Sequence, residues 1–222
     1  ISGSTFSFGC EYVFNSGQSN QISISFDSNT ANKFAITWLD NTGDYGTACV
    51  GVISGTSVSF GTHAVYKSAR TDYQKISVYP LAVAFDPNTA GKFVVVYQDG
   101  GNSNHGTAII GTRSGTSISF GTEATFYPNN VTQMVAAYDP SQANKVVILY
   151  RNDFASDVGV ALVGTVSGTS ISYGTAVVFN NASTNYMAIA FNPTGANFVI
   201  VYRDNVSPYP SEFIVGTYSG TT

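Results

Sequence analysis

Two kinds of hydrophobic pattern alternate along the chain, and both predict short β-strands. In the first kind, large and small residues alternate with a period of two, at 22–26, 81–85, 134–138 and 187–191. In the second kind the apolar run is nearly continuous, at 34–38, 93–97, 146–150 and 198–202. The β-branched content, short length and flanking turn residues of these runs favour a strand packed on both faces over a buried helix. No segment carries helical periodicity with caps, so we predict an all-β fold.

This strand pattern occurs four times. The phrase STFSFG at 4–9 returns as TSVSFG, TSISFG and TSISYG, which end at Gly61, Gly121 and Gly174. The final glycines, counted from Gly9, are 52, 60 and 53 residues apart, close to the ~50 residues of a kelch blade. Each repeat also has a shorter apolar stretch, around Cys49, Ile109, Leu162 and Ile214. Four strands per repeat predict a β-propeller with four blades of four antiparallel strands.

We expect a single propeller domain over residues 1–222. Its predicted blades are 21–67, 80–127, 133–180, and 186–217 plus 4–14. The chain starts on an outermost strand and ends on a third strand, so the N-terminal strand is predicted to join the last blade and close the ring. The alternative is part of a larger propeller or a linear array. Because the chain opens at Ile1 without a leader, we expect a processed chain or a piece of a longer one.

The connections between strands fall into two sets. Turns such as 86–91 and 192–196, and the Ser-Gly pairs such as 54–55, are near-identical between repeats and lie on one face. The loops on the opposite face differ between repeats, and individual function can reside in such differences. Crossover loops are expected on this face at 15–20, 67–76, 127–130 and 180–185.

One crossover loop is longer than the others. Twenty residues separate Gly61 from Leu81, whereas 13 follow the other marker glycines, so this repeat carries a seven-residue insertion. The insertion is the best candidate for a recognition loop, and an accident of a tolerant surface loop is the alternative. Its candidate binding residues are Lys67, Arg70, Asp72, Tyr73 and Lys75. Aromatic rings beside Asn and Asp suit sugars, which adds the variable-face residues Tyr45, Tyr127, Tyr186 and Tyr209.

The loops after the second strands are rich in side-chain oxygens, the ligands that calcium prefers. The candidate calcium ligands are Asp40, Asp44, Asp99, Asp153, Asp157 and Asp204. None of these loops completes the Asp-x-Asp-x-Asp-Gly pattern with its closing Glu, so ordinary Asx turns are the alternative interpretation. We expect no other cofactor.

Composition excludes several classes of protein. The chain is 43% hydrophobic and only 10% charged, against roughly 25% charged in an average domain, which argues against disorder. No run of about 20 apolar residues is present, so we expect no membrane insertion. Nine Lys plus Arg against thirteen Asp plus Glu give a net charge of −4, which argues against nucleic acid as a partner.

Catalytic motifs are absent from the sequence, and we expect no enzyme. His63 and His105 lie far apart without a His/Cys cluster, so zinc is unsupported, and no GxSxG, GxxxxGK(S/T) or HExxH occurs. Cys10 and Cys49 are expected on neighbouring blades, either as a disulfide or as separate small buried residues. Glycosylation sequons, which arise by chance or carry glycans, stand at Asn130, Asn181 and Asn205.

The unit pattern as a whole resembles a known group of repeats. AlaPheAspPro at 84–87, the strand 93–97, IleGlyThr at 110–112 and SerGlyThrSerIleSerPheGlyThr at 114–122 resemble repeat arrays of marine viral, phage tail-fibre-like, and bacterial surface proteins. The resemblance spans all 222 residues, but its motifs are turn and strand phrases, so no functional residue is carried over. It implies an extracellular or virion-surface location and an adhesion or structural role.

We therefore expect a non-enzymatic adhesion or receptor-binding propeller module of an extracellular or virion surface assembly. Its expected partner is a cell-surface glycan or protein receptor, with other subunits of a fibre or surface assembly as further partners. One alternative is a lectin with sites repeated around the ring, and another is a purely structural repeat spacer.

Overall fold

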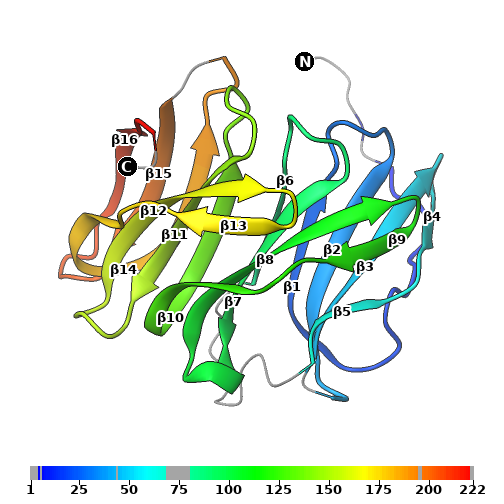
Figure 1. Cartoon of the computed structure of the whole chain (residues 1–222), viewed down its shortest axis with the longest axis horizontal. Helices are drawn as coiled ribbons and strands as arrows, with labels where there is room; N and C mark the ends of the chain where they lie inside the picture. Colours follow the sequence, from blue (N-terminus) through cyan, green and yellow to red (C-terminus); the bar gives the residue numbers. More distant parts are fainter. Residues whose placement is uncertain (1–4, 6, 44, 69–80, 195–196, 221–222) are drawn as a thin grey trace.

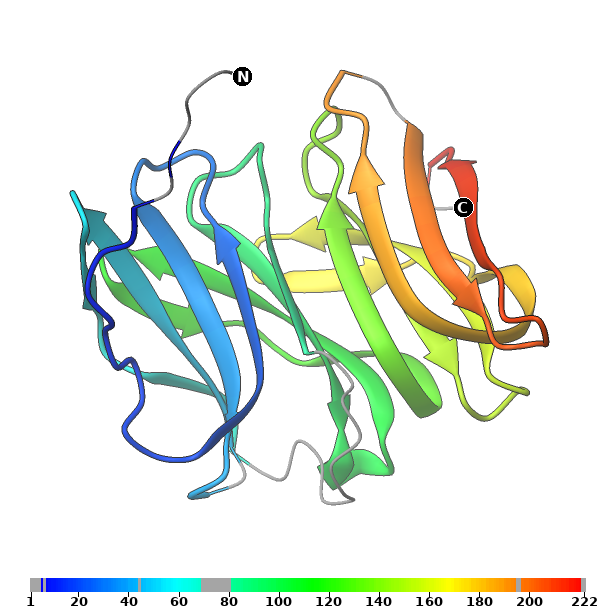
Figure 2. The same ribbon diagram turned by 180° about the vertical axis from the view of Figure 1, so that it is seen from behind.

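The computed structural model describes residues 5, 7–43, 45–68, 81–194 and 197–220 (Figure 1). Within these ranges the chain is built from antiparallel strands and one 3-10 turn, which confirms the all-β prediction. No helix in the described part of the chain has the length and apolarity needed to cross a membrane. Figures 1 and 2 show the strands side by side in upright sheets that fan out along the long axis of the molecule.

We call the four sequence repeats units 1 to 4. Unit 1 contains β1 (Ser19–Phe26), β2 (Lys33–Asp40), β3 (Tyr45–Ser54), β4 (Ser57–Phe60) and β5 (Ala64–Lys67). Unit 2 contains β6 (Ala82–Phe85), β7 (Lys92–Asp99), the 3-10 turn η1 (Gly100–Asn102), β8 (His105–Ser114), β9 (Ser117–Phe120) and the first half of β10 (Ala124–Tyr138). The first three strands of each unit pair as an antiparallel meander in sequence order, as predicted.

Units 3 and 4 continue the same pattern. Unit 3 contains the second half of β10, β11 (Lys145–Asn152), β12 (Val158–Ser167), β13 (Ser170–Tyr173) and the first half of β14 (Val177–Phe191). Unit 4 contains the second half of β14, β15 (Asn197–Asp204) and β16 (Ser211–Thr217). The strands predicted from the two hydrophobic patterns are all present in the described residues.

The predicted crossover loops at 127–130 and 180–185 are wrong. Both segments lie inside the 15-residue strands β10 and β14, which leave one unit as its outer strand and enter the next as its first strand. Asn130 pairs with His105 of unit 2, and the next residue, Val131, pairs with Asn152 of unit 3. Because the polar residues change partners through β-bulges, their turn-like composition does not interrupt the strand.

The turns that the sequence predicts as structural do form. Gly55, Gly115 and Gly168 each have a φ of about +60°, the left-handed conformation that glycine adopts without steric cost. In the other set, Asp86 Oδ1 accepts a hydrogen bond from the Asn88 amide at 2.8 Å, and Asn192 Oδ1 accepts one from Thr194 at 3.1 Å. These are Asx turns, in which a short side chain bonds its own backbone two residues on.

Consecutive units pack through two opposite faces of each sheet. The front face of a unit contacts the preceding unit, and its back face contacts the next one. Side chains alternate along a strand, so Phe93, Val95 and Tyr97 of β7 point to the front, into a core with Ala35 and Ala48 of unit 1. The second strands of units 2 and 3 read as continuously apolar because both of their faces are covered in this way.

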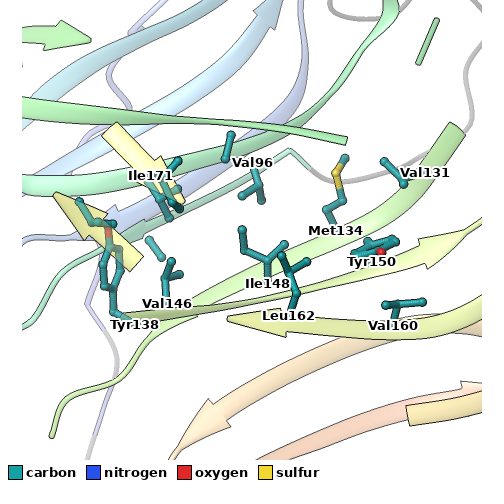
Figure 3. Close-up of a cluster of buried hydrophobic side chains, with 14 of the residues drawn as sticks. Val96, Val131, Met134, Tyr138, Val146, Ile148, Tyr150, Val160, Leu162 and Ile171 are labelled. Atoms are coloured by element: carbon teal, nitrogen blue, oxygen red, sulfur yellow. The ribbon is translucent and has the colours of Figure 1, made fainter. Parts of the chain in front are cut away.

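The back face of unit 2 meets the front face of unit 3 in the largest hydrophobic cluster. Figure 3 shows this cluster, in which Val96 of unit 2 lies over Ile148 and Leu162 of unit 3. A third cluster joins the back of unit 3 to Phe198, Ile200 and other front residues of unit 4. The three interfaces repeat one arrangement, so the chain has a periodic core.

The structure does not show the predicted closure of the ring by the N-terminal strand. Residues 5 and 7–18 form no strand, and in the described part of the chain β16 pairs with β15 alone. The N-terminal segment packs instead on the front face of unit 1, where the Phe14 ring contacts Trp38 at 5.1 Å. Units 1 and 4 stand at opposite ends of the molecule (Figure 2).

Candidate functional site

The loops that differ between the repeats gather at one end of the sheets, the lower end in Figure 1. We call this the variable end. It comprises 15–18, 41–43, 100–104, 127–133, 153–157, 180–186 and 205–210. The Asx and Ser-Gly turns occupy the opposite end. The variable end is the candidate functional surface, and its side chains fall into a polar network and a set of exposed aromatic rings.

The polar network links units 2, 3 and 4. Gln98 donates to Asn130 Oδ1 at 2.8 Å, and Asn130 donates to Asp153 at 3.4 Å. Arg151 donates from Nε to Asp153 Oδ1 at 2.6 Å and from Nη1 to Asn185 Oδ1 of unit 4 at 2.7 Å. The bonds of Asn130 to Asp153 and of Arg151 to Asn185 join neighbouring units, so the network holds the variable end of these units in register.

A bulge recurs at the start of the first strand in each unit where that segment is described. Gln21, Gln133 and Tyr186 occupy equivalent positions and have φ values of 50°, 51° and 55°. Non-glycine residues rarely adopt this left-handed conformation, which costs about 1 kcal/mol or more and is concentrated at functional or structurally constrained positions. Gln133 donates to Asn185 Oδ1 of the next unit, which ties the bulge to the network.

Exposed aromatic side chains project from the loops between second and third strands. Tyr45 in unit 1 is 41% exposed, Phe154 in unit 3 is 72% exposed, and Tyr209 in unit 4 is 56% exposed. Aromatic rings in water lose apolar hydration on binding and stack on flat apolar surfaces, so they act as anchors for sugars and proteins. Phe154 was not a sequence candidate; the signal for it was an apolar residue in the otherwise polar loop 153–157.

An arginine lies between two of the predicted tyrosines. The Arg203 guanidinium carbon is 4.7 Å from the centre of the Tyr186 ring and 5.9 Å from that of Tyr209. Arg203 Nη2 donates to Asn205 Oδ1 at 2.9 Å. An open pocket of about 450 Å³ lies beside this group, lined in part by Val201, Glu212 and Phe213. The structure therefore brings together Tyr186 and Tyr209, which the sequence placed in separate loops.

Most of the predicted recognition loop lies outside the described residues. Arg70, Asp72, Tyr73 and Lys75 belong to that part. Lys67 is described, and its Nζ forms ion pairs with Asp99 at 2.8 Å and Glu123 at 2.7 Å. Burial acts to lower the pKa of Lys67, but the hydrogen bonds and charges of these two carboxylates raise it overall. Lys67 is thus neutralised by its own protein, as a structural ion pair between units 1 and 2.

The remaining predicted tyrosine, Tyr127, is also engaged. Its ring lies 5.4 Å from that of Tyr150, and its hydroxyl accepts a hydrogen bond from Asn152 at 2.9 Å. The side chain is partly buried under the network rather than projecting from it. Of the four tyrosines proposed for sugar binding, Tyr45, Tyr186 and Tyr209 remain exposed.

The candidate calcium ligands that the structure describes form no common metal site. Among the described residues no three His, Cys, Asp or Glu side chains form a group that could hold a metal ion. Asp40 and Asp204 accept hydrogen bonds from the backbone amides two residues on, at 3.0 and 2.9 Å. Asp99 pairs with Lys67, and Asp153 and Asp157 both approach Arg151. Asp44 lies outside the described residues.

The two cysteines and the histidine nearest to them form no reactive pair. Cys10 is exposed and Cys49 is buried, and both are free thiols. Burial raises the pKa of Cys49 to about 11, so it stays protonated at neutral pH. His63 Nε2 lies 2.8 Å from the Phe14 carbonyl oxygen and its ring packs edge-on against Trp38. The disulfide alternative is not observed.

Comparison with known proteins places the fold but not the function. No protein-family model matches the sequence, and no curated protein does. Among solved structures the chain is similar to Sqt1 from Chaetomium thermophilum, with TM-scores of 0.54 to 0.56 and 15–16% identity over 82–85% of this chain. One of those structures is Sqt1 bound to the N-terminus of the ribosomal protein L10.

The chain spans only 40–44% of the Sqt1 chains, and at this identity the likeness shows the fold alone. The described residues thus form antiparallel sheets that resemble part of a WD40 β-propeller.

Proposed function

We propose that the four units act as propeller blades and that the chain is a non-enzymatic binding module of an extracellular or virion surface assembly. Its variable end engages a cell-surface glycan or protein receptor. The observation that carries the proposal is the exposure of three aromatic rings in or beside the loops of the variable end, Tyr45, Phe154 and Tyr209, together with the polar network that links units 2 to 4 at the same end. Aromatic anchors surrounded by amide and hydroxyl groups are typical of protein recognition surfaces.

The contrast between the two ends of the sheets supports this assignment. At the turn end, side chains are used to hold the units together: the carboxylate of Asp27 is fully buried and pairs with Arg113 of the next unit. At the variable end the rings of Tyr45, Phe154 and Tyr209 are exposed, and exposed apolar groups of this kind mark interaction sites when they gather on one surface. Sqt1 shows that a related fold can hold a polypeptide segment, the N-terminus of L10.

A binding role suits the chemistry better than catalysis. The Cys49 thiol is buried and protonated, and His63 is occupied by Phe14 and Trp38. Lys67 forms ion pairs with both Asp99 and Glu123. These ion-pair contacts give Lys67, Asp99 and Glu123 a structural role that a binding module accommodates without a catalytic one.

The aromatic tips also favour one composite surface over identical sites in every unit. Unit 1 presents Tyr45, unit 3 Phe154 and unit 4 Tyr209, while the corresponding turn of unit 2 is the glycine-rich η1. A lectin with a site in each blade would repeat the same residues. We therefore place the recurring-site lectin second, and the purely structural spacer third because it leaves the exposed rings without a role.

The test compares the chain with loop-tip variants in two binding assays. Fluorescently labelled protein is applied to a glycan array and to a panel of intact microbial and animal cells. The variant Phe154→Ser/Tyr209→Ser is predicted to lose at least about tenfold in affinity, because each anchor contributes more than about 1 kcal/mol. Val65→Ser is the matched control, since Val65 is 49% exposed on β5 of unit 1, whereas Phe154 and Tyr209 belong to units 3 and 4.

The outcomes separate the alternatives. Binding by the native chain and the control, lost in the loop-tip variant, supports the proposal. Equal binding by all three contradicts the assignment to the variable end. No binding of the native chain to any glycan or cell overturns the module proposal and favours the structural spacer.

A further inference from the structure

The three interfaces between units are built from the same pair of surfaces. In each, aliphatic residues on the back of one unit meet a front face of the next unit that combines aromatic and aliphatic residues. The first strands also bond across the boundary: Ser23 and Ser25 accept hydrogen bonds from the backbone amides of Val83 and Phe85. A back face and a front face are therefore complementary wherever they meet in this chain.

The back face of unit 4 and the first strand on the front face of unit 1 remain exposed, whereas Phe34, Ile36 and Trp38 on that front face are only 0–7% exposed. Four positions on the back of unit 2 are each 0% exposed, Val94, Val96, Ala108 and Ile110. Their equivalents on the back of unit 4 are 39–75% exposed, Val199, Val201, Phe213 and Val215. At the other end of the molecule the first strand of unit 1 exposes Ile22, Ile24 and Phe26 by about 55% each. Their equivalents Leu81, Val83 and Phe85 are 2–7% exposed.

The N-terminal segment already lies where the outer strand of a preceding unit would lie. A Cβ on Gly9 would collide with the Thr56 carbonyl oxygen, and the marker glycines Gly61 and Gly121 approach Thr116 and Thr169 in the same way. The Phe14 ring lies 5.1 Å from Trp38, as Tyr66 lies 5.3 Å from Tyr97 and Phe179 lies 5.3 Å from Tyr202. On the front of unit 1, the N-terminal segment therefore occupies the position that the outer strand of the preceding unit occupies on the other front faces.

Unit 4 lacks that outer strand. In units 1 to 3 the strand before the marker glycine pairs with the end of the third strand, and the glycine amide donates to it, as Gly61 does to Val50 at 2.8 Å. In the described residues of unit 4 nothing pairs with the outer edge of β16. A pocket of about 150 Å³ lies there, lined in part by Phe198, Ile214 and Tyr218. Its volume matches one aromatic ring, and in units 1 and 2 Phe60 and Phe120 pack on the equivalents of Phe198.

At the variable end, the exposed faces of units 4 and 1 also carry a hydrogen-bond donor and an acceptor in equivalent positions to a bonded pair inside the chain. Arg151 of unit 3 donates to Asn185 of unit 4 at 2.7 Å. Arg203 is the equivalent of Arg151, and Asn20, exposed on the first strand of unit 1, is the equivalent of Asn185. The back face of unit 4 thus carries the donor, and the first strand of unit 1 carries the acceptor.

We propose that the chain pairs head to tail with a second copy of itself, so that the back of each unit 4 covers the front of the other copy's unit 1. The N-terminal segment of each copy then becomes the fourth strand beside β16 of the other, a β-strand addition that pairs the open edge. Two equivalent head-to-tail contacts close the pair into a ring of eight units. The fold likeness fits this size, since 82–85% of this four-unit chain covers 40–44% of the Sqt1 chains.

The side-chain packing at the proposed junction differs from the packing at the internal interfaces. Unit 4 has Ser211 and Phe213 where the other units have Gly and Ala, as at Gly46 and Ala48. Phe213 is 75% exposed in the single chain, and pairing with the second copy covers it. The junction between unit 4 and unit 1 therefore differs from the internal interfaces. This difference favours pairing of the unit 4 back face with a second copy over its insertion between two internal units.

The mass of the native chain in solution gives the first test. Sedimentation equilibrium at tens of micromolar is predicted to give twice the 23.4 kDa of one chain. The back-face variant Ala188→Asp and the front-face variant Ile24→Lys are each predicted to weaken the pair by about 100-fold or more, because each buries an unpaired charge at the junction. Val65→Lys, on the outer strand, is the control and is predicted to keep the native mass.

Mixing the two variants tests the head-to-tail geometry. One junction of the mixed pair keeps both native faces, and the other brings the introduced carboxylate to the introduced ammonium, so the mixture is predicted to regain twice the chain mass. A second set, Val201→Asp with Ile22→Lys, repeats the test if a variant of the first set fails to fold by circular dichroism. All four positions are exposed in the single chain, so each introduced charge is placed in solvent when the chain is unpaired.

The other outcomes overturn the proposal. A native chain that stays monomeric at 200 µM fits a ring closed within one chain. Assemblies larger than two copies indicate an open array. Loss of pairing in only one of the two variants indicates that like faces meet, and no loss in either places the contact elsewhere.

Discussion

Arg113 and Asp27 tie unit 2 to unit 1 through a buried ion pair, and replacing the arginine tests how the turn end is held together. Arg113 Nη2 lies 2.6 Å from Asp27 Oδ2, and the side chains of Arg113 and Asp27 are 7% and 0% exposed. Arg113 also donates to the Thr30 hydroxyl at 2.8 Å. The variant Arg113→Val is well matched in shape, because unit 3 carries Val166 at the equivalent position.

The expected cost follows from the burial of the carboxylate. Removal of one partner of a buried ion pair leaves an uncompensated charge, which lowers the free energy of unfolding by about 3–5 kcal/mol. The double variant Asp27→Asn/Arg113→Val removes the charge as well. It keeps the Asx turn, since Asn192 makes that turn in unit 4. We therefore expect the double variant to lose only about 1–2 kcal/mol, with a coupling energy of about 2 kcal/mol or more.

Urea unfolding at pH 7 measures both values. Trp38 is the single tryptophan and is fully buried, so its fluorescence reports the loss of the unit 1 core. All variants are compared at one protein concentration, because pairing of copies would add to the apparent stability. A loss below about 1 kcal/mol in Arg113→Val, or a double variant no more stable than the single one, would refute the reasoning.

Two further predictions concern packing and pH. Gly111→Ala places a Cβ against the buried Phe93 ring, and we expect it to lower the free energy of unfolding in urea by about 1–3 kcal/mol. The control Gly115→Ala meets no atom. It is expected to lower the free energy of unfolding by only about 1 kcal/mol, because of its φ of 63°. If both cost the same, close packing is not the cause. Burial acts to raise the pKa of Asp139, but the hydrogen bonds from Tyr218 and Ser141 outweigh it and lower the pKa. That stabilisation is present at neutral pH and is lost as the pH falls through the lowered pKa, so the stability deficit of Tyr218→Phe is predicted to shrink below about pH 4. A deficit that grows on acidification contradicts the assignment.

The sequence predicts most of the strand framework because the framework is periodic. Alternation at 22–26 and continuous runs such as 93–97 each report how many faces of a strand are covered, and that is a local property of the chain. The Ser-Gly turns are equally predictable from the sequence, because the positive φ at Gly55 favours glycine. Repetition strengthened each of these predictions by providing independent copies.

The candidate site was less predictable because it depends on contacts between units. Lys67 reads as a free cation in a variable loop, but folding places it against Asp99 and Glu123, which lie 32 and 56 residues away. The segments 127–130 and 180–185 read as loops because bulged strands tolerate Asn and Pro. The grouping of Tyr186 and Tyr209 around Arg203 needed the register of β14 against β15, which composition does not encode.

The complementarity of front and back faces can be measured most directly at β16. Cys10 lies exposed on the N-terminal segment and accepts a spin label, whereas the buried Cys49, whose pKa is raised to about 11, does not. Labelled chain is mixed with ¹⁵N-enriched unlabelled chain, and amide line broadening is recorded. We predict broadening of the Ser211–Thr217 amides of the enriched chain, because the partner's N-terminal segment lies beside β16. Sharp β16 amides in the mixture, with broadening only when the enriched chain itself carries the label, would contradict pairing between copies.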